Sequence, residues 1–66
     1  MNNVDIILPT YNCAEYIEEA INSVIDQTLE NWKLIIIDDA SKDSTTSLIK
    51  NYLNDKRIVL KILKKK

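Results

Sequence analysis

The sequence predicts an α/β fold in which a three-stranded parallel sheet, in the order 3-2-1, carries two helices on one face. Apolar runs of strand length alternate with segments of helical periodicity, and the middle run is apolar without interruption, as in strands that are covered on both faces. At 66 residues the chain allows one small domain, which buries only about 60% of its unfolded surface. We therefore expect one half of a Rossmann-like, doubly wound domain.

The first strand is predicted at residues 4–8, an apolar run that is interrupted only by Asp5 and followed by Pro9. A helix follows, because Asn12 and Glu15 have the spacing of a capping box. Apolar residues then recur at intervals of three and four along one stripe: Ala14, Ile17, Ala20, Ile21, Val24 and Ile25. This stripe predicts an amphipathic helix that packs on the sheet.

The second strand is predicted at residues 33–37, after a turn at Asn31-Trp32. Asp43 can cap a second helix, whose expected inward-facing residues are Leu48, Ile49, Tyr52 and Leu53. A third strand is expected at about 57–63. Right-handed crossovers between parallel strands place both helices on the same face, so the chain leaves the other face open. The first strand also has an open edge. We expect either that the chain is the N-terminal part of a larger domain or that two copies associate through the open edge or face.

Charge and composition limit the classes of partner. The net charge is −1, but residues 1–55 contain all ten acidic residues and three lysines, whereas residues 56–66 contain six basic residues and no acid. Those basic residues alternate with apolar ones, as in a strand with charged margins, so we expect no nucleic-acid partner. With a single cysteine, Cys13, and no histidine, the sequence predicts neither an internal disulfide nor a Cys/His zinc site. We read Cys13 as inert, and we expect a reducing, cytoplasmic compartment and no membrane span.

Polar residues follow the first two strands at the points where those strands end. Pro9-Thr10-Tyr11-Asn12 follows the first apolar run, and Asp38-Asp39 follows the second. In an open parallel sheet, ligands bind outside the carboxyl ends of the strands. The sequence therefore predicts a binding site in which an aromatic ring and a pair of carboxylates meet.

Three segments resemble one known family. They are Val4 to Asn12, Ala20 to Thr28 and Ile35 to Thr45, and they occur in the right order and at the right spacings. Together they resemble the opening of family 2 glycosyltransferases, whose fold is called GT-A. The resemblance implies that residues 1–66 form a single partial domain, the nucleotide-binding part, which holds the uridine of a nucleotide-sugar donor, usually a UDP-sugar.

The same resemblance implies nucleotide-binding roles for Pro9, Thr10, Tyr11, Asp38 and Asp39. A carboxylate can accept a charge-assisted hydrogen bond from the N3–H of uracil, and Tyr11 can stack on the ring. The full-length enzyme is expected to transfer a sugar, with inversion, to a saccharide or lipid-linked acceptor, at the inner membrane surface. It is expected to use Mg²⁺ or Mn²⁺ held by an acidic motif beyond residue 66, where the catalytic base is also expected. We therefore expect residues 1–66 to bind no metal and to be inactive alone.

One position departs from the family pattern. The family usually has glycine where this chain has Ala40, and the chain contains no glycine. A left-handed backbone strains alanine, so we expect the loop to take a different turn there. Near it, Ser41 and Asp43 are expected to order the loop and cap the helix, Lys42 to be a solvated charge, and Trp32 to serve in packing.

Less specific interpretations of these residues stay open. Without the resemblance, Tyr11 could only cover the sheet end, Asp38 could only cap a turn, and Thr10 could be an ordinary loop residue. Two other classes of function also remain. One is a noncatalytic module that associates with a second copy or a partner through its open sheet face. The other is a phosphoryl-accepting receiver-like domain, although the chain lacks the further strand-end aspartate and lysine that this chemistry needs.

Overall fold

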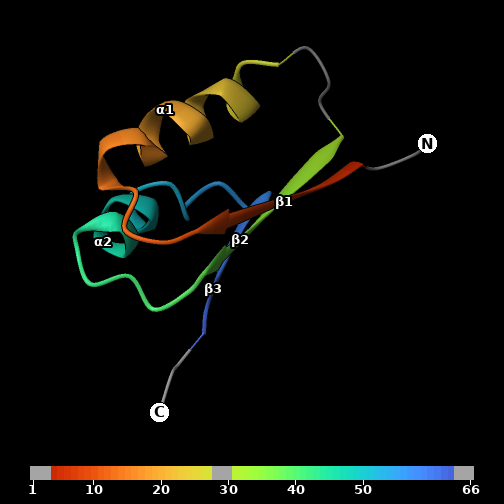
Figure 1. The fold of residues 1–66 in the computed structure, drawn as a ribbon. Helices are drawn as coiled ribbons and strands as arrows, with labels where there is room; N and C mark the ends of the chain where they lie inside the picture. The colour runs from red at the N-terminus through yellow and green to blue at the C-terminus, as the bar shows by residue number, and fades with distance from the viewer. Residues whose placement is uncertain (1–3, 28–30, 64–66) are drawn as a thin grey trace.

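The computed structural model describes residues 4–27 and 31–63. Thr28 and residues 64–66, which entered the sequence analysis, lie outside these ranges. The described elements are β1 (Val4–Thr10), α1 (Ala14–Ile25), β2 (Trp32–Asp38), α2 (Thr45–Lys50) and β3 (Ile58–Ile62). The strands pair in parallel in the order β1-β2-β3, which is the predicted order read from the opposite edge. Both helices lie on the same side of the sheet (Figure 1), so the predicted fold class is confirmed.

The hydrophobic core lies between the helices and one face of the sheet. Along β2, Leu34 and Ile36 are fully buried, and the alternate residues Ile35 and Ile37 are only partly buried. This alternation follows from the two-residue period of a strand, because only one of its faces meets the helices. The buried cluster contains Ile17, Ile21, Trp32, Leu34, Ile36, Ile49 and Ile58.

The opposite face of the sheet carries apolar residues that the described helices do not cover. Ile7 in β1 is 55% exposed, although it pairs with the central-strand residue Ile35. Val59 of β3 continues the same row on the other side of Ile35. Leu63, just after β3, is 50% exposed. Within residues 4–27 and 31–63, the sheet is thus covered on one face only, as the sequence predicted.

Several predicted boundaries move by one or two residues. β1 runs past Pro9 to Thr10 instead of ending at residue 8, which proline permits because β1 is an edge strand. β2 begins at Trp32 and ends at Asp38, and β3 covers 58–62 instead of 57–63. α2 ends at Lys50, so Tyr52 and Leu53 lie in the turns after the helix, where both still pack against the core.

The predicted capping box at Asn12 is wrong. The N-cap of α1 is Cys13, and its side chain makes no capping hydrogen bond. Instead, residues at the beginning of α2 and in the loop before it hold the start of α1: the N–H of Cys13 donates to Thr45 Oγ1 at 2.9 Å, and the N–H of Ala14 donates to Asp43 Oδ2 at 3.3 Å. A long-range partner has replaced the local one, which no sequence spacing could reveal.

Asp43 also accepts hydrogen bonds at the beginning of α2, although it lies one residue before the N-cap position. The N-cap of α2 is Ser44, but Asp43 Oδ1 accepts the N–H of Thr45 at 2.9 Å, and it also accepts the Thr45 hydroxyl. These hydrogen bonds from Thr45 hold the pKa of Asp43 below its ordinary value. One carboxylate therefore joins the beginnings of α1 and α2.

Trp32 has the packing role that the sequence predicted. Its side chain is only 3% exposed, and the guanidinium carbon of Arg57 lies 3.9 Å from the ring centroid. Arg57 in turn pairs with Asp55, with 2.8 Å between Nη2 and Oδ2. The cation–π contact therefore secures the amino end of β2 against the turn before β3.

Candidate functional site

The carboxyl ends of β1 and β2 meet at one edge of the sheet. Their register pairs Thr10 with Asp38, the last residue of each strand. The N–H of Asp39 donates to the Thr10 carbonyl at 2.9 Å, which continues the pairing one step beyond the strands. Tyr11 directly follows β1 and Asp39 directly follows β2, so the fold brings these two residues to the same edge of the sheet.

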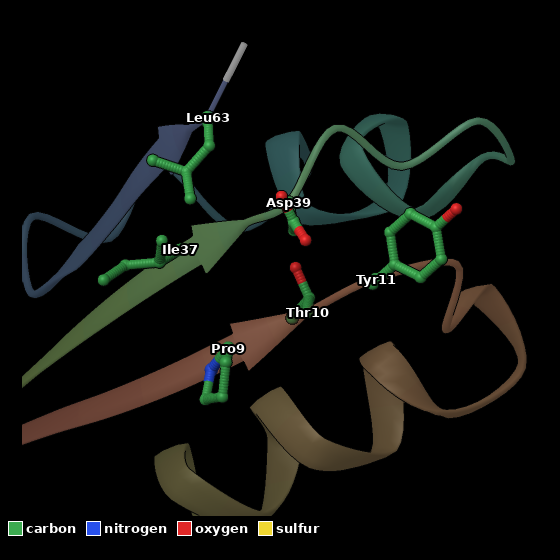
Figure 2. A pocket seen from close by; sticks show the side chains of 6 residues that line it. All are labelled: Pro9, Thr10, Tyr11, Ile37, Asp39 and Leu63. Carbon is green, nitrogen blue, oxygen red and sulfur yellow. The ribbon is translucent and has the colours of Figure 1, made fainter. Parts of the chain in front are cut away.

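A pocket of about 420 Å³ opens at this edge. Its lining residues are Pro9, Thr10, Tyr11, Ile37, Asp39 and Leu63. Figure 2 shows the Asp39 side chain between the Tyr11 ring on one side and Ile37 and Leu63 on the other. Tyr11 is 53% exposed, so its ring is accessible to a ligand in the pocket. The pocket thus combines a carboxylate, an aromatic face and an apolar wall.

Four of the five predicted site residues line this pocket, and Asp38 does not. The Asp38 side chain is fully buried, and three groups donate hydrogen bonds to it. Oδ1 accepts the Thr10 hydroxyl at 2.7 Å and the Ser41 hydroxyl at 2.5 Å, and Oδ2 accepts the Ser41 N–H at 2.7 Å. Asp38 therefore lies beneath the pocket and holds Thr10 and the loop that follows β2.

The hydrogen bonds also decide the charge state of Asp38. Burial by itself raises the pKa of a carboxyl group, because it disfavours the charged form. Here the hydrogen bonds from Ser41 and Thr10 together outweigh the effect of burial, and the pKa of Asp38 lies below its ordinary value. The carboxylate is therefore ionised at neutral pH, which strengthens each of its hydrogen bonds.

The loop after β2 takes the conformation that alanine was expected to avoid. Ala40 has φ = 57°, in the left-handed region, so the expectation of a different turn is wrong. The two hydrogen bonds between Ser41 and Asp38 close the loop around Ala40 and stabilise the strained residue. Ser41 thus orders the loop, as the sequence predicted.

Asn12 connects the two loops that carry the pocket residues. Its N–H donates to Ser41 Oγ at 2.9 Å, and its Oδ1 accepts the N–H of Lys42 at 2.8 Å. Asn12 has φ = 47°, a left-handed conformation that asparagine tolerates better than most residues. The Asn12 side chain, which was expected to cap α1, therefore pairs with the opposite loop.

The sequence analysis missed Ile37 and Leu63 as pocket residues. Ile37 is two residues before Asp39, so the two-residue period of extended backbone places both on the same side of the sheet, and this signal was available in the sequence. Leu63 was not recognisable, because its position depends on the register of β3. The N–H of Leu63 donates to the Asp38 carbonyl at 2.8 Å, which places Leu63 opposite Asp39.

The site has the chemistry to hold a flat heteroaromatic ring. The Asp39 carboxylate is an acceptor for an N–H at the edge of such a ring, and Tyr11 supplies an aromatic face. Among the described residues there is no group of three or more His, Cys, Asp or Glu side chains that could hold a metal ion. In the same part of the chain, none of the helices has the length and apolar character needed to cross a membrane.

Comparison with known sequences gives a consistent result. The pattern of glycosyl transferase family 2 matches residues 5–66. The chain is 51% identical over 55 residues to protein CgeD of Bacillus subtilis strain 168, covering 83% of this chain and 13% of CgeD. It is 43% identical over 49 residues to the putative teichuronic acid biosynthesis glycosyltransferase TuaG of the same strain, covering 74% of this chain and 19% of TuaG.

Solved structures share the fold. Residues 1–349 of TarS from S. aureus match with a TM-score of 0.86 and 29% identity, covering 96% of this chain and 19% of that one. The mannosyltransferase PcManGT from Pyrobaculum calidifontis, in complex with GDP-Man and Mn²⁺, matches with a TM-score of 0.77 and 28% identity, covering 92% and 19%. The chain thus spans less than a fifth of the length of each of these relatives.

Proposed function

Because the chain belongs to glycosyl transferase family 2 and has the fold of the N-terminal part of a GT-A domain, we propose that its pocket holds the nucleobase of a UDP-sugar donor. One observation carries the proposal: Tyr11 and Asp39, from neighbouring strand ends, line the same pocket. The chain would then be the donor-binding part of a longer transferase.

Asp39 is the residue proposed to select the base. Uracil has a donor at N3, and a carboxylate that accepts it forms a charge-assisted hydrogen bond that contributes about 1.5–3 kcal/mol. Cytosine has an acceptor at the same position, so its lone pair would face the carboxylate and weaken binding. Guanine has N–H donors on its Watson–Crick edge, so GDP is the nucleotide that must be compared most closely with UDP.

Tyr11 is proposed to supply the stacking surface. A base that stacks on an aromatic side chain gains about 1–3 kcal/mol, whatever its identity. Ile37 and Leu63, which lie across the pocket from Tyr11 in Figure 2, would contact the opposite side of the base. The ring and the apolar wall would therefore contribute affinity, and Asp39 would contribute selectivity.

Pro9, Thr10 and Asp38 are proposed to shape the pocket. Pro9 and Thr10 line it and would present backbone polar groups to the base or the ribose. Asp38, which lies beneath the pocket, would fix the positions of Thr10 and Ser41 by accepting hydrogen bonds from their hydroxyls. Direct contact between Asp38 and the nucleotide stays a prediction of the family resemblance.

The reaction of the longer protein is proposed to be sugar transfer, with inversion, to a saccharide or lipid-linked acceptor. TuaG is named for teichuronic acid biosynthesis, which supports a saccharide product. The PcManGT structure contains Mn²⁺, which supports a divalent cation in this enzyme as well. Among the described residues of this chain there is no group of three or more His, Cys, Asp or Glu side chains that fits such a cation. We propose that residues 1–66 alone have no transferase activity.

Nucleotide titration followed by calorimetry or NMR tests the proposal. We expect the chain to bind UDP more tightly than CDP or GDP, and Asp39→Ala and Tyr11→Ala each to weaken UDP binding about tenfold or more. Asp5→Ala and Tyr16→Ala are matched controls, since Asp5 lies at the other end of β1 and Tyr16 lies on α1. Equal affinity for UDP and CDP, or tighter binding of GDP, would contradict a uridine site.

A second proposal concerns the uncovered sheet face. The exposure of Ile7, which does not line the pocket, favours self-association, because burying exposed apolar surface lowers the free energy of a protein in water. We expect sedimentation equilibrium at micromolar concentration to show a dimer that Ile7→Lys dissociates and that Tyr16→Lys leaves intact. A compact, stable monomer of the unaltered chain would refute this proposal.

A further inference from the structure

Asn12 makes two hydrogen bonds to the loop that follows β2. Its backbone N–H is 2.9 Å from Ser41 Oγ, and its side-chain Oδ1 is 2.8 Å from the backbone nitrogen of Lys42. Ser41 is held at the same time by Asp38, through 2.5 Å and 2.7 Å hydrogen bonds. Asn12 therefore attaches its own loop to a loop that is already anchored to the buried end of β2.

The positions of these contacts relative to the pocket are informative. Asn12 follows Tyr11 directly, and the loop it contacts begins with Asp39. Thr10, on the other side of Tyr11, is held by Asp38 and by the Asp39 N–H. The backbone of Tyr11 is thus fixed on both sides to the segment that carries Asp39.

We propose that Asn12 is a positioning residue of the pocket, which sets the Tyr11 ring at the correct place relative to the Asp39 carboxylate. The identity of the ligand rests on the proposed function, but the placement of Tyr11 does not. Asn12 acts through Tyr11 and is not itself among the residues that line the pocket.

Contacts of the fold that do not involve Asn12 separate this role from general stabilisation. Asn12 is exposed and lies outside the hydrophobic core and the residues packed against it. The strand ends are joined by Thr10 and Asp38, and the beginning of α1 is held by Asp43 and Thr45. Loss of the Asn12 side chain therefore leaves the fold supported and removes one of the two hydrogen bonds between Asn12 and the loop after β2.

Three substitutions separate the backbone and side-chain contributions of Asn12. Asn12→Gly accommodates the positive φ and keeps the N–H to Ser41, but loses the acceptor for Lys42. Asn12→Ala loses the acceptor and also disfavours the left-handed backbone. Asn12→Asp keeps an acceptor oxygen and tolerates the left-handed region, so it serves as the conservative rescue.

The first measurement needs no nucleotide. NMR χ1 couplings and ring chemical shifts of Tyr11 report its rotamer distribution, and urea denaturation reports stability. We expect Asn12→Ala and Asn12→Gly to give an averaged Tyr11 rotamer, Asn12→Asp to preserve the native distribution, and Tyr16 to be unchanged in all three. An unchanged Tyr11 rotamer in Asn12→Gly, the variant that retains the backbone conformation, would overturn the inference.

The second measurement uses UDP and CDP as the probes. We expect Asn12→Gly to lower UDP affinity about fivefold, to reduce the ratio of UDP to CDP affinity, and to leave the urea midpoint nearly unchanged. An equal loss for both nucleotides would overturn the link between Asn12 and base selection. If neither nucleotide binds the unaltered chain while the Tyr11 rotamer still responds to Asn12, the proposed function fails and the positioning role stands.

Discussion

The hydroxyl of Thr10 donates a 2.7 Å hydrogen bond to the buried carboxylate of Asp38, and this bond joins the last residues of β1 and β2. The pair lies directly beneath the candidate site, because Tyr11 is the next residue after β1 and Asp39 is the next residue after β2. The stability of the sheet edge and the geometry of the pocket therefore depend on the same two side chains.

Asp38→Asn is expected to destabilise the chain by about 2–3 kcal/mol. The amide keeps the volume of the side chain but loses the charge and replaces one acceptor oxygen with a donor, so a hydrogen bond from Thr10 or Ser41 is lost. Urea denaturation followed by circular dichroism measures the change. Asp39→Asn, at the partly exposed neighbouring position, is the control and is expected to change stability by less than about 1 kcal/mol.

The stability of the chain is expected to fall in acid. The pKa values of Asp38, Asp43 and Asp55 are all lowered in the folded state by hydrogen bonds. The unfolded chain therefore takes up protons at a higher pH than the folded one, and stability is lost as the pH falls from about 4 through the folded-state pKa values. Urea midpoints between pH 2 and pH 7 measure the effect, which we expect to be smaller in Asp38→Asn. A flat profile below about pH 4 would contradict the assigned hydrogen bonds.

Ala40→Gly is expected to stabilise the chain by about 0.5–1 kcal/mol. Glycine removes the strain of a left-handed alanine, and this gain exceeds the entropy that glycine loses on folding. Ala20→Gly, in the middle of α1, is the control with the opposite expected sign, because it should lower the free energy of unfolding by about 1 kcal/mol. Thermal or urea denaturation of both variants measures the difference, and destabilisation by Ala40→Gly would show that the loop does not have this conformation in solution.

Two isoleucines in neighbouring strands, Ile36 in β2 and Ile7 in β1, should differ sharply in their contribution to stability. Ile36→Ala leaves a cavity in the core and is expected to cost about 2–5 kcal/mol, enough to unfold much of a small domain. Ile7→Ala removes a side chain from the uncovered face and is expected to cost less than about 1 kcal/mol in dilute solution. The circular dichroism signal of each variant reports how much of it remains folded. If Ile7→Ala lost as much of this signal as Ile36→Ala, both faces of the sheet would have to be covered.

Much of the fold was predictable from local patterns. The stripe through Ile17 and Ile21 predicted the buried face of α1, and the unbroken run at 34–37 predicted the central strand. The polar residues after the two strands predicted the sheet edge at which Tyr11 and Asp39 meet. These patterns are readable because periodicity and strand ends depend on neighbouring residues alone.

The details that were wrong depend on contacts between distant residues. The spacing of Asn12 and Glu15 predicted a cap, but Asn12 pairs with Ser41 and Lys42 instead. The strain at Ala40 predicted a different turn, but the hydrogen bonds from Ser41 to Asp38 stabilise the left-handed residue. Each error arose because a partner about thirty residues away, or a closed loop, offered a stronger interaction than the local alternative.

The amino-acid sequence by itself determined the order of the elements and the sheet edge that carries the candidate site. Only the tertiary structure decided that Asp38 lies beneath the pocket while Asp39 lines it, and that Leu63 completes the wall. Adjacent residues of a strand point to opposite faces, and what covers each face depends on how helices and a third strand pack from elsewhere in the chain. That packing is a long-range property, so it separates two aspartates that are neighbours in the sequence.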